Sequence, residues 1–201
     1  MDSEDLTILA ELVSEDAQVL PIDTVYGGQE VTLTEEEDID YFIKIKGLSE
    51  QILIIKCDKF PAPKSIFKNS KRECKRADYI ILTNTENKKT AVFLELKKGN
   101  PDNAELICQL KGAFCFLKYC QKIGQVFWEK PNFLAGYEYK FAVIKEIPKV
   151  NLKKKTTRIR HENLANRIKM KNIGIPEMPT CYFIFKHQEE IHLKKLLNNI
   201  S

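Results

Sequence analysis

Three ionisable side chains with complementary chemistry occur near the middle of the chain. Asp78 lies at the start of one apolar run, and Glu95 and Lys97 lie in the next one, residues 91–99. Successive side chains of a strand point to opposite faces, so Glu95 and Lys97 would share one face. Two carboxylates can hold a divalent cation, and a nearby ammonium can orient a water molecule and offset negative charge. These residues are therefore the first candidates for a catalytic site.

The elements that must position these side chains are the two apolar runs, 77–82 and 91–99, joined by a polar stretch. An antiparallel hairpin centred on residues 86–87 would place Asp78 directly opposite Glu95. Opposed carboxylates repel each other in a sheet, and a charge among apolar neighbours is costly to desolvate. A divalent cation would offset both costs, and Mg²⁺ suits one or two carboxylates completed by water and phosphate oxygens.

This arrangement resembles the signature of the PD-(D/E)xK nuclease superfamily. The matching residues are Asp78 and the triplet Glu95, Leu96 and Lys97 at the end of the following strand, with a helix after them. The resemblance implies that Asp78, Glu95 and the backbone carbonyl of Leu96 hold one or two Mg²⁺ ions, for which Mn²⁺ could substitute. It also implies that Lys97 positions or activates the attacking water.

The resemblance spans about residues 65–145. It departs from the family pattern at Ala77, where the nominal proline stands, although that position varies within the family. In several branches a glutamine from the next helix approaches the active site, which makes Gln109 a further catalytic candidate; the alternative is an ordinary polar helix residue. Glu73 is similarly either an additional acid of the site or a surface residue.

The resemblance implies an α/β (α+β) fold in which a restriction-endonuclease-like central mixed sheet is flanked by helices. At 201 residues the chain is long enough for one domain with a substantial extension. We therefore expect an acidic N-terminal α/β extension over residues 1–50, packed on the core, and a nuclease-like domain over residues 51–201.

The net charge of +4 hides a division between these segments. Residues 1–50 contain 14 Asp and Glu and two Lys, a net charge of −12, whereas residues 51–201 contain 30 Lys and Arg and 14 acids, a net charge of +16. A basic body favours a polyanion as partner, with a solvated lysine-rich surface as the alternative. The residues expected to contact a nucleic-acid backbone are Lys64, Lys68, Lys71, Arg72, Lys75, Arg76, Lys98, Lys153, Lys154 and Lys155.

The periodicity of apolar residues predicts further helices and strands. An acidic helix followed by a strand is expected in residues 2–20, and a helix capped by Thr34 over residues 35–44. A metal site within the acidic residues 35–40 is disfavoured, because consecutive acids point in different directions. The later predictions are strands at 51–57, 137–147 and 180–186, a helix from Asp102 to about residue 122, and helices at 161–170 and 189–199.

Composition excludes several other classes of protein. The six cysteines form no CxxC pair, which argues against a zinc site of the usual spacing. We expect these cysteines to be reduced and buried and to pack as small hydrophobic residues. No apolar run approaches the roughly twenty residues of a membrane span, and Met1 to Glu4 show no signal-peptide pattern. A cytoplasmic protein without a membrane partner is therefore expected.

These features predict a Mg²⁺-dependent nuclease that hydrolyses phosphodiester bonds, with DNA as the first expected substrate and restriction, phage defence or repair as fitting roles. An RNA-directed nuclease of the same fold is one alternative. Another is a catalytically silent nucleic-acid-binding or assembly subunit, which docks to partners through its acidic first fifty residues. A homodimer or a place in a larger complex fits either case. The simplest alternative is an exposed ion pair between Glu95 and Lys97, worth at most about 1 kcal/mol.

Overall fold

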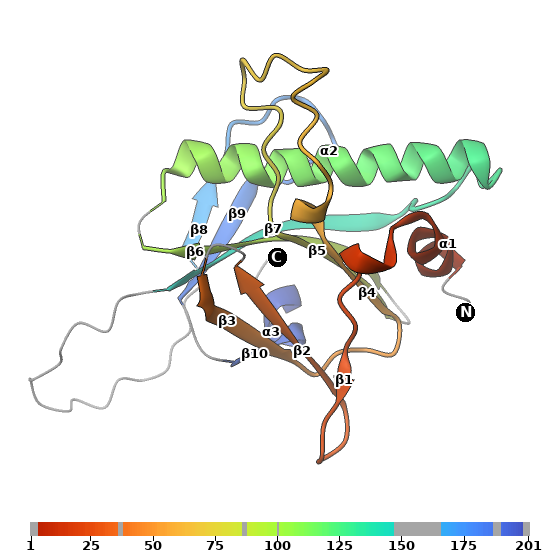
Figure 1. Cartoon of the computed structure of the whole chain (residues 1–201), viewed down its shortest axis with the longest axis vertical. Coiled ribbons are helices and arrows are strands. Elements are labelled where there is room, and N and C mark those ends of the chain that lie inside the picture. Colours follow the sequence, from red (N-terminus) through yellow and green to blue (C-terminus); the bar gives the residue numbers. More distant parts are fainter. Residues whose placement is uncertain are drawn as a thin grey trace, which may run out of the picture.

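The structure, a computed structural model, describes residues 4–35, 38–85, 88–99, 101–146, 166–186 and 190–198. Within these ranges the protein has a mixed α/β fold with two mixed sheets (Figure 1). The helices are α1 (Glu4–Leu12), α2 (Asn103–Phe127) and α3 (Leu193–Asn198), with short 3₁₀ helices η1 (Glu15–Ala17) and η2 (Cys57–Lys59). The strands are β1 (Ile22–Asp23), β2 (Gln29–Glu35), β3 (Asp38–Lys46), β4 (Ile52–Lys56), β5 (Tyr79–Thr85), β6 (Lys88–Lys98), β7 (Tyr137–Glu146), β8 (Asn166–Lys169), β9 (Cys181–Lys186) and β10 (Glu190–His192).

Strands β5 and β6 form the hairpin that the alternation of apolar residues predicts. Tyr79 lies opposite Leu94, so the next pair of the same register is Asp78 and Glu95. Residues 86–87, between the two strands, lie outside the described part of the chain. The predicted register is confirmed by the paired residues of β5 and β6.

The larger sheet has six strands in the order β4-β5-β6-β7-β9-β8. Strands β4, β5 and β6 are antiparallel, whereas β6, β7 and β9 run parallel. Parallel neighbours need a crossover that returns the chain to the same end of the sheet, and α2 makes it between β6 and β7. Asp102 caps α2 as predicted, because its Oδ1 accepts a hydrogen bond from the Ala104 N–H (3.1 Å).

The smaller sheet has four strands in the order β1-β2-β3-β10. Its first three strands come from the acidic N-terminal segment, and β10 joins them by pairing parallel to β3. Figure 1 shows this sheet on the opposite face of the larger sheet from α2. The larger sheet is thus covered by α2 on one face and by the smaller sheet with α3 on the other.

The side chains of β6 alternate between the two cores that result. Phe93 lies in the core beneath α2, where its ring is 5.9 Å from that of Phe114. Val92, Leu94 and Leu96 lie in the core between the two sheets. Burying each such side chain stabilises the fold by about 1.5–3 kcal/mol, so both faces of the hairpin are held by packing.

One predicted helix is a strand. Residues 38–46 form β3 in place of the helix predicted for residues 35–44, because Tyr41, Ile43 and Ile45 are buried with a period of two. The acids before them resemble the first turn of a helix, which suggested the wrong element.

The C-terminal predictions need similar corrections. Residues 166–169 form β8, which pairs antiparallel with β9, where a helix was predicted for residues 161–170; residues 161–165 lie outside the described ranges. The strand predicted for residues 180–186 is confirmed as β9. The helix predicted for residues 189–199 is shorter, because β10 precedes α3. Helix α2 is longer than predicted and ends at Phe127.

All six cysteines are free. Three are buried, as predicted: Cys57, Cys74 and Cys120. The prediction of burial is wrong for three others, which are partly or fully exposed: Cys108, Cys115 and Cys181. Among the helices that the structure describes, none combines the length and apolar character needed to cross a bilayer.

Candidate active site

Asp78 and Glu95 interlock at one end of the β5–β6 hairpin. The Asp78 N–H donates a hydrogen bond to Oε2 of Glu95 (3.1 Å), and the Leu96 N–H donates one to Oδ2 of Asp78 (2.7 Å). Hydrogen bonds from backbone N–H groups to carboxylates are short and strong. Each carboxylate is therefore held by the backbone of the opposite side of the hairpin.

Lys97 adds a positive charge to this pair. Its Nζ lies 2.9 Å from Oε1 of Glu95 and 3.6 Å from Oε1 of Glu35. The Glu95 side chain is fully buried, whereas 23% of the Lys97 side chain is exposed. The ammonium thus lies between a buried carboxylate and solvent. Complete burial of Glu95 excludes the interpretation of an exposed surface ion pair. We call Asp78, Glu95, Lys97 and Glu35 the acid–lysine cluster.

Tyr79 positions the part of β2 that supplies Glu35. Its hydroxyl donates to the Thr34 carbonyl (2.6 Å) and accepts from the Thr34 N–H (3.1 Å). Because Tyr79 directly follows Asp78, one short segment of the chain places both the acid of the hairpin and the end of β2. The two sheets therefore meet at the acid–lysine cluster.

Sequence reasoning missed Glu35, although a signal was present. Val31 and Leu33 are buried on β2, and simple alternation along the sequence would continue their face to Glu35, although the register with β3 shifts between Thr34 and Glu35. A charged residue that continues a buried face is a candidate for a site. Glu73, the extra acid that was considered, is exposed and accepts a hydrogen bond from the Lys71 N–H (2.8 Å).

Burial controls the electrostatics of the acid–lysine cluster. Desolvation raises the pKa of Asp78 to about 7, against the opposing effects of the Leu96 N–H and Lys97. Desolvation, followed by the charge of Asp78, raises the pKa of Glu95 to about 8. Desolvation by itself lowers the pKa of Lys97, but the surrounding carboxylates outweigh it and hold this pKa above its ordinary value. Lys97 is therefore protonated at neutral pH, and both acids would gain from an additional positive charge.

Gln109, the remaining predicted catalytic residue, lies on α2. It is buried, and its Oε1 has no hydrogen-bond partner among the described residues. Glu105 lies one turn earlier on the same face of the helix. The pKa of Glu105 is lowered mainly by Lys75 and, more weakly, by the charge of Lys97. The first turns of α2 therefore lie within electrostatic range of the cluster.

The donor atoms of the cluster fit a hard divalent cation. The N–H and C=O of one strand residue face the same neighbour, so the Leu96 carbonyl lies on the side where its N–H meets Asp78. Oε2 of Glu35 is buried and lacks a hydrogen-bond partner in the described part of the chain. Over the same residues, no three His, Cys, Asp or Glu side chains are grouped as a metal site by themselves. Mg²⁺ is compatible with this set, because it binds one or two carboxylates and keeps water or substrate oxygens as its other ligands.

The predicted nucleic-acid-binding residues lie mostly on the basic loop, residues 60–76, which leads from η2 toward β5. Three of them are exposed and have no ion pair within the described ranges: Lys64, Lys68 and Lys71. Two others pair with acids at the start of α2, Arg72 with Asp102 (3.6 Å) and Lys75 with Glu105 (2.8 Å). These pairs dock the loop against the helix.

Arg76 supports the base of the basic loop. Its guanidinium donates to the carbonyls of Cys74 (3.0 Å) and Pro61 (3.4 Å) and stacks 4.7 Å from the centre of the Phe60 ring. These contacts give Arg76 a structural role. Lys98 is exposed at the end of β6. The other predicted basic residues, Lys153, Lys154 and Lys155, lie outside the described residues.

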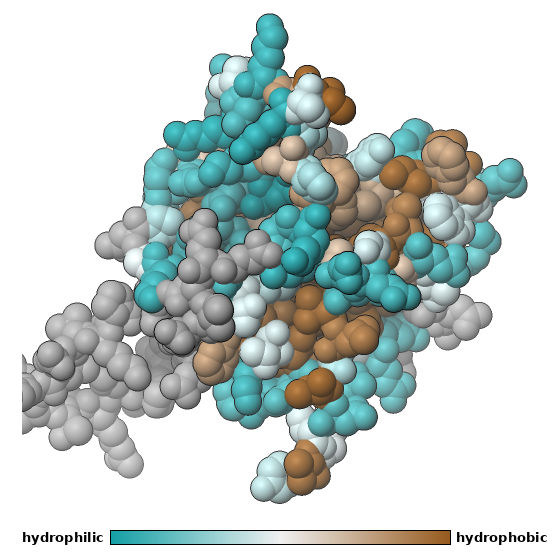
Figure 2. Space-filling model, in the orientation of Figure 1, coloured by the Kyte–Doolittle hydropathy of each residue, from teal (hydrophilic) through white to brown (hydrophobic). Residues whose placement is uncertain are grey.

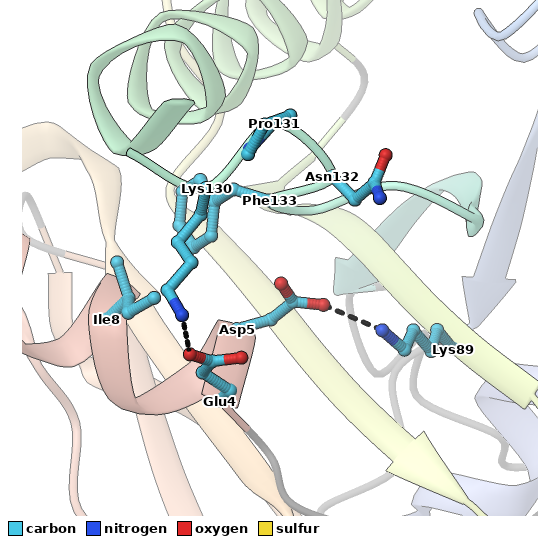
Figure 3. A pocket seen from close by; sticks show the side chains of 8 residues that line it. All are labelled: Glu4, Asp5, Ile8, Lys89, Lys130, Pro131, Asn132 and Phe133. Carbon is cyan, nitrogen blue, oxygen red and sulfur yellow. Dashed lines mark hydrogen bonds and ion pairs between the residues drawn. The ribbon is translucent and has the colours of Figure 1, made fainter. Parts of the chain in front are cut away.

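A second group of charges lies at the opposite end of β6, around a pocket of about 330 Å³ (Figure 3). Lys89 pairs with Asp5 (2.7 Å), and Lys130 pairs with Glu4. Six residues of strand, at about 3.3 Å each, separate Lys89 from Glu95, so roughly 20 Å lies between them. All four charged residues that line this pocket are in ion pairs, which hold α1 to β6 and to the segment after α2.

Comparison of the chain with protein-family models, with curated proteins and with solved structures finds no match. Within the described residues, the acid–lysine cluster combines buried carboxylates with a partly exposed ammonium.

Proposed function

We propose that this protein is a Mg²⁺-dependent nuclease that hydrolyses phosphodiester bonds of DNA and has a restriction-endonuclease-like fold. The observation that carries the proposal is the convergence of Asp78, Glu95 and Lys97 in a largely buried cluster. Removing several charges from water is costly, and a hydrophobic replacement often stabilises a fold as well or better. A catalytic role gives a reason for such a cluster.

The order of the elements supports the same proposal. Asp78 immediately precedes β5, and Glu95 and Lys97 lie near the end of β6. Helix α2 follows, and β7 then pairs parallel to β6. The resemblance to PD-(D/E)xK nucleases implies this order of elements: a strand, a second strand with the Glu-x-Lys triplet, a helix and another strand.

The residues of the cluster would divide the chemistry among them. Lys97 can donate a hydrogen bond to a water molecule and offset the negative charge that develops on the phosphate, because its ammonium faces both Glu95 and solvent. Asp78, Glu95 and the Leu96 carbonyl would hold the cation. Bound Mg²⁺ would supply polarisation of the phosphate and a more acidic water.

The test is a cleavage assay of the whole chain on plasmid DNA, single-stranded DNA and RNA in Mg²⁺, Mn²⁺ or EDTA. The variant is Glu95→Gln, which removes one charge with little change of shape. The matched control is Glu4→Gln, which removes a carboxylate from the surface ion pair at the far end of β6. We expect metal-dependent DNA cleavage by wild type and control, and a loss of at least about 100-fold in Glu95→Gln.

Other outcomes would assign other functions. Cleavage of RNA alone would retain the site but change the substrate. Absence of cleavage in every metal, with equal DNA binding by wild type and Glu95→Gln, would overturn the nuclease proposal. It would favour a silent nucleic-acid-binding or assembly subunit.

A further inference from the structure

The basic loop carries two large apolar side chains at its tip. Ile66 is 77% exposed and Phe67 is 50% exposed. Lys64 and Lys68 flank them in the sequence, and Lys71 follows. In Figure 1 the loop projects beyond α2, on the side of the helix away from the sheets. The space-filling view shows this projection as a mostly hydrophilic surface with a hydrophobic group at its end (Figure 2).

The tip is held in a defined conformation by its own backbone. The N–H groups of Ile66 and Phe67 both donate to the Pro63 carbonyl, at 3.0 and 2.9 Å. Farther along, Oδ1 of Asn69 accepts a hydrogen bond from the Cys74 N–H (3.1 Å). The two apolar side chains are thus presented to solvent by a structured turn, which lowers the entropic cost of binding.

The base of the loop is fixed on α2, close to the candidate active site. The Lys75 carbonyl packs so tightly against Gly112 that a Cβ at this glycine would lie 1.7 Å from the carbonyl oxygen. The Lys75 side chain pairs with Glu105 on the first turn of α2 (2.8 Å). The loop ends at Arg76, two residues before Asp78 of the acid–lysine cluster, and its tip projects beyond α2 (Figure 1). A long polymer bound at the cluster would meet the tip where it extends past α2.

We propose that Ile66 and Phe67 form a wedge that stacks against the bases of the bound nucleic acid, while the adjacent lysines hold the flanking phosphates. This inference rests on the proposed nuclease function and specifies how that substrate is held. Aromatic and aliphatic side chains stack on bases or enter base steps, and loss of one such contact weakens binding by about 5–150-fold. Lys64, Lys68 and Lys71, which have no ion pair to any residue that the structure describes, supply the charge complementarity to phosphates.

The first test uses a fluorescent reporter that needs no catalysis. Trp128 is the only tryptophan in the chain, so Phe67→Trp in a Trp128→Phe background places a single indole at the tip. The matched control is Phe127→Trp in the same background, because Phe127 is 76% exposed at the other end of α2. In EDTA, a duplex oligonucleotide should quench the emission of the Phe67→Trp protein and leave the control unchanged.

The second test separates stacking from charge. We expect Phe67→Ala to weaken duplex binding in EDTA by about tenfold, within the range for loss of one stacked base, without changing the salt dependence. Lys68→Ala should instead reduce the slope of log K against log salt by about one, because it removes one phosphate contact.

The outcomes of the wedge and of the nuclease proposal are distinguishable. Metal-dependent cleavage with an unquenched Phe67→Trp reporter and unchanged binding by Phe67→Ala would overturn the wedge and leave the nuclease standing. The wedge would also be overturned if anionic lipid vesicles or protein changed the emission of the Phe67→Trp protein and DNA and RNA did not. Quenching by nucleic acid together with weaker binding by Phe67→Ala supports the wedge, even if the chain cleaves nothing.

Discussion

The two ends of strand β6 carry the same residue types in opposite environments. At one end, Lys97 lies 2.9 Å from a fully buried Glu95. At the other end, Lys89 pairs with Asp5 at 2.7 Å, and 45% of the lysine side chain is exposed. The Asp5 side chain is 14% exposed, but water reaches and screens the lysine of this pair, so its net contribution is about 0–1 kcal/mol. In the first pair the carboxylate has lost its water while Lys97 keeps partial contact with solvent, and the desolvation penalty of the acid can exceed the attraction between the two charges.

The difference shows what turns an ion pair into a candidate site. Distance does not distinguish the two pairs, because both are shorter than 3 Å. What differs is the second carboxylate beside Glu95 and the apolar packing around it. Asp78 and burial together raise the pKa of Glu95, whereas Asp5 and Lys89 simply fasten α1 to the larger sheet. The comparison leads to four predictions.

The largest expected effect is on catalysis. Lys97→Ala should lower the single-turnover rate of DNA cleavage in Mg²⁺ by at least about 100-fold, because in the proposed function its ammonium orients the attacking water and offsets the charge on the phosphate. Lys89→Ala removes a lysine of the same strand at the exposed end and should cleave like wild type. Equal losses in the two variants would show that the ends of β6 are functionally equivalent and would contradict the comparison.

The next effect is on the pH dependence of stability without metal. Folded Asp78 and Glu95 have pKa values raised to about 7 and about 8, so between about pH 4 and these values the folded state binds more protons than the unfolded state. The free energy of unfolding must therefore fall as pH rises through this window, by about 1.4 kcal/mol per group and unit. Urea unfolding in EDTA from about pH 5 to about pH 9 measures this slope.

The matched variants for that experiment are two double replacements. Asp78→Asn with Glu95→Gln should flatten the dependence of the free energy of unfolding on pH, because neither replacement side chain titrates. Asp5→Asn with Glu138→Gln removes two acids near the other end of β6, where Glu138 of β7 pairs with Lys88, and should leave most of the pH dependence in place. A wild-type protein whose stability rises across the window would contradict the raised pKa values.

A smaller effect is expected where the two sheets meet. Tyr79→Phe removes the hydroxyl that binds both backbone groups of Thr34, and it should lower the free energy of unfolding by about 1–2 kcal/mol. Tyr119→Phe is the control, because Tyr119 is 57% exposed on α2. Urea unfolding of both variants measures the difference. Equal stability of the two would mean that Tyr79 does not hold β2 at the site.

The smallest effect is expected at the exposed end of β6. Lys130→Ala breaks its ion pair with Glu4 and should cost at most about 1 kcal/mol, and this cost should shrink further in high salt. Unfolding in low and high salt measures it. A loss several times larger would show that these surface pairs are as consequential as the buried cluster.

The sequence predicts the hairpin and three residues of the cluster because that information is local. Alternation of apolar residues defines the faces of β6, and the polar stretch between the runs defines the register. Asp78, Glu95 and Lys97 are then brought together by the pairing of two adjacent strands. The cap at Asp102 and the buried stripe of α2 are equally local features.

The remaining features depend on pairing between distant segments. Strand β3 was mistaken for a helix because its acidic start resembles a helix terminus, and only pairing with β2 and β10 decides otherwise. Glu35 reaches Lys97 because the Tyr79 hydroxyl holds Thr34, which lies 45 residues earlier. No periodicity within one segment encodes such a contact. For the same reason the conformation of the basic loop, with its apolar tip, follows from its contacts with α2 and from its turns.

The pairing of β10 with β3 also sets an order of assembly during synthesis. Ile191 lies beside Ile45, so these neighbours leave the ribosome far apart in time, at about 5–20 residues per second. The edge of β3 stays open until β10 has been translated, although every strand of the larger sheet has emerged by then. The sheet that presents Glu35 to Lys97 is thus closed last. In a growing chain, β10 would therefore complete the smaller sheet only after all four residues of the acid–lysine cluster have been synthesised.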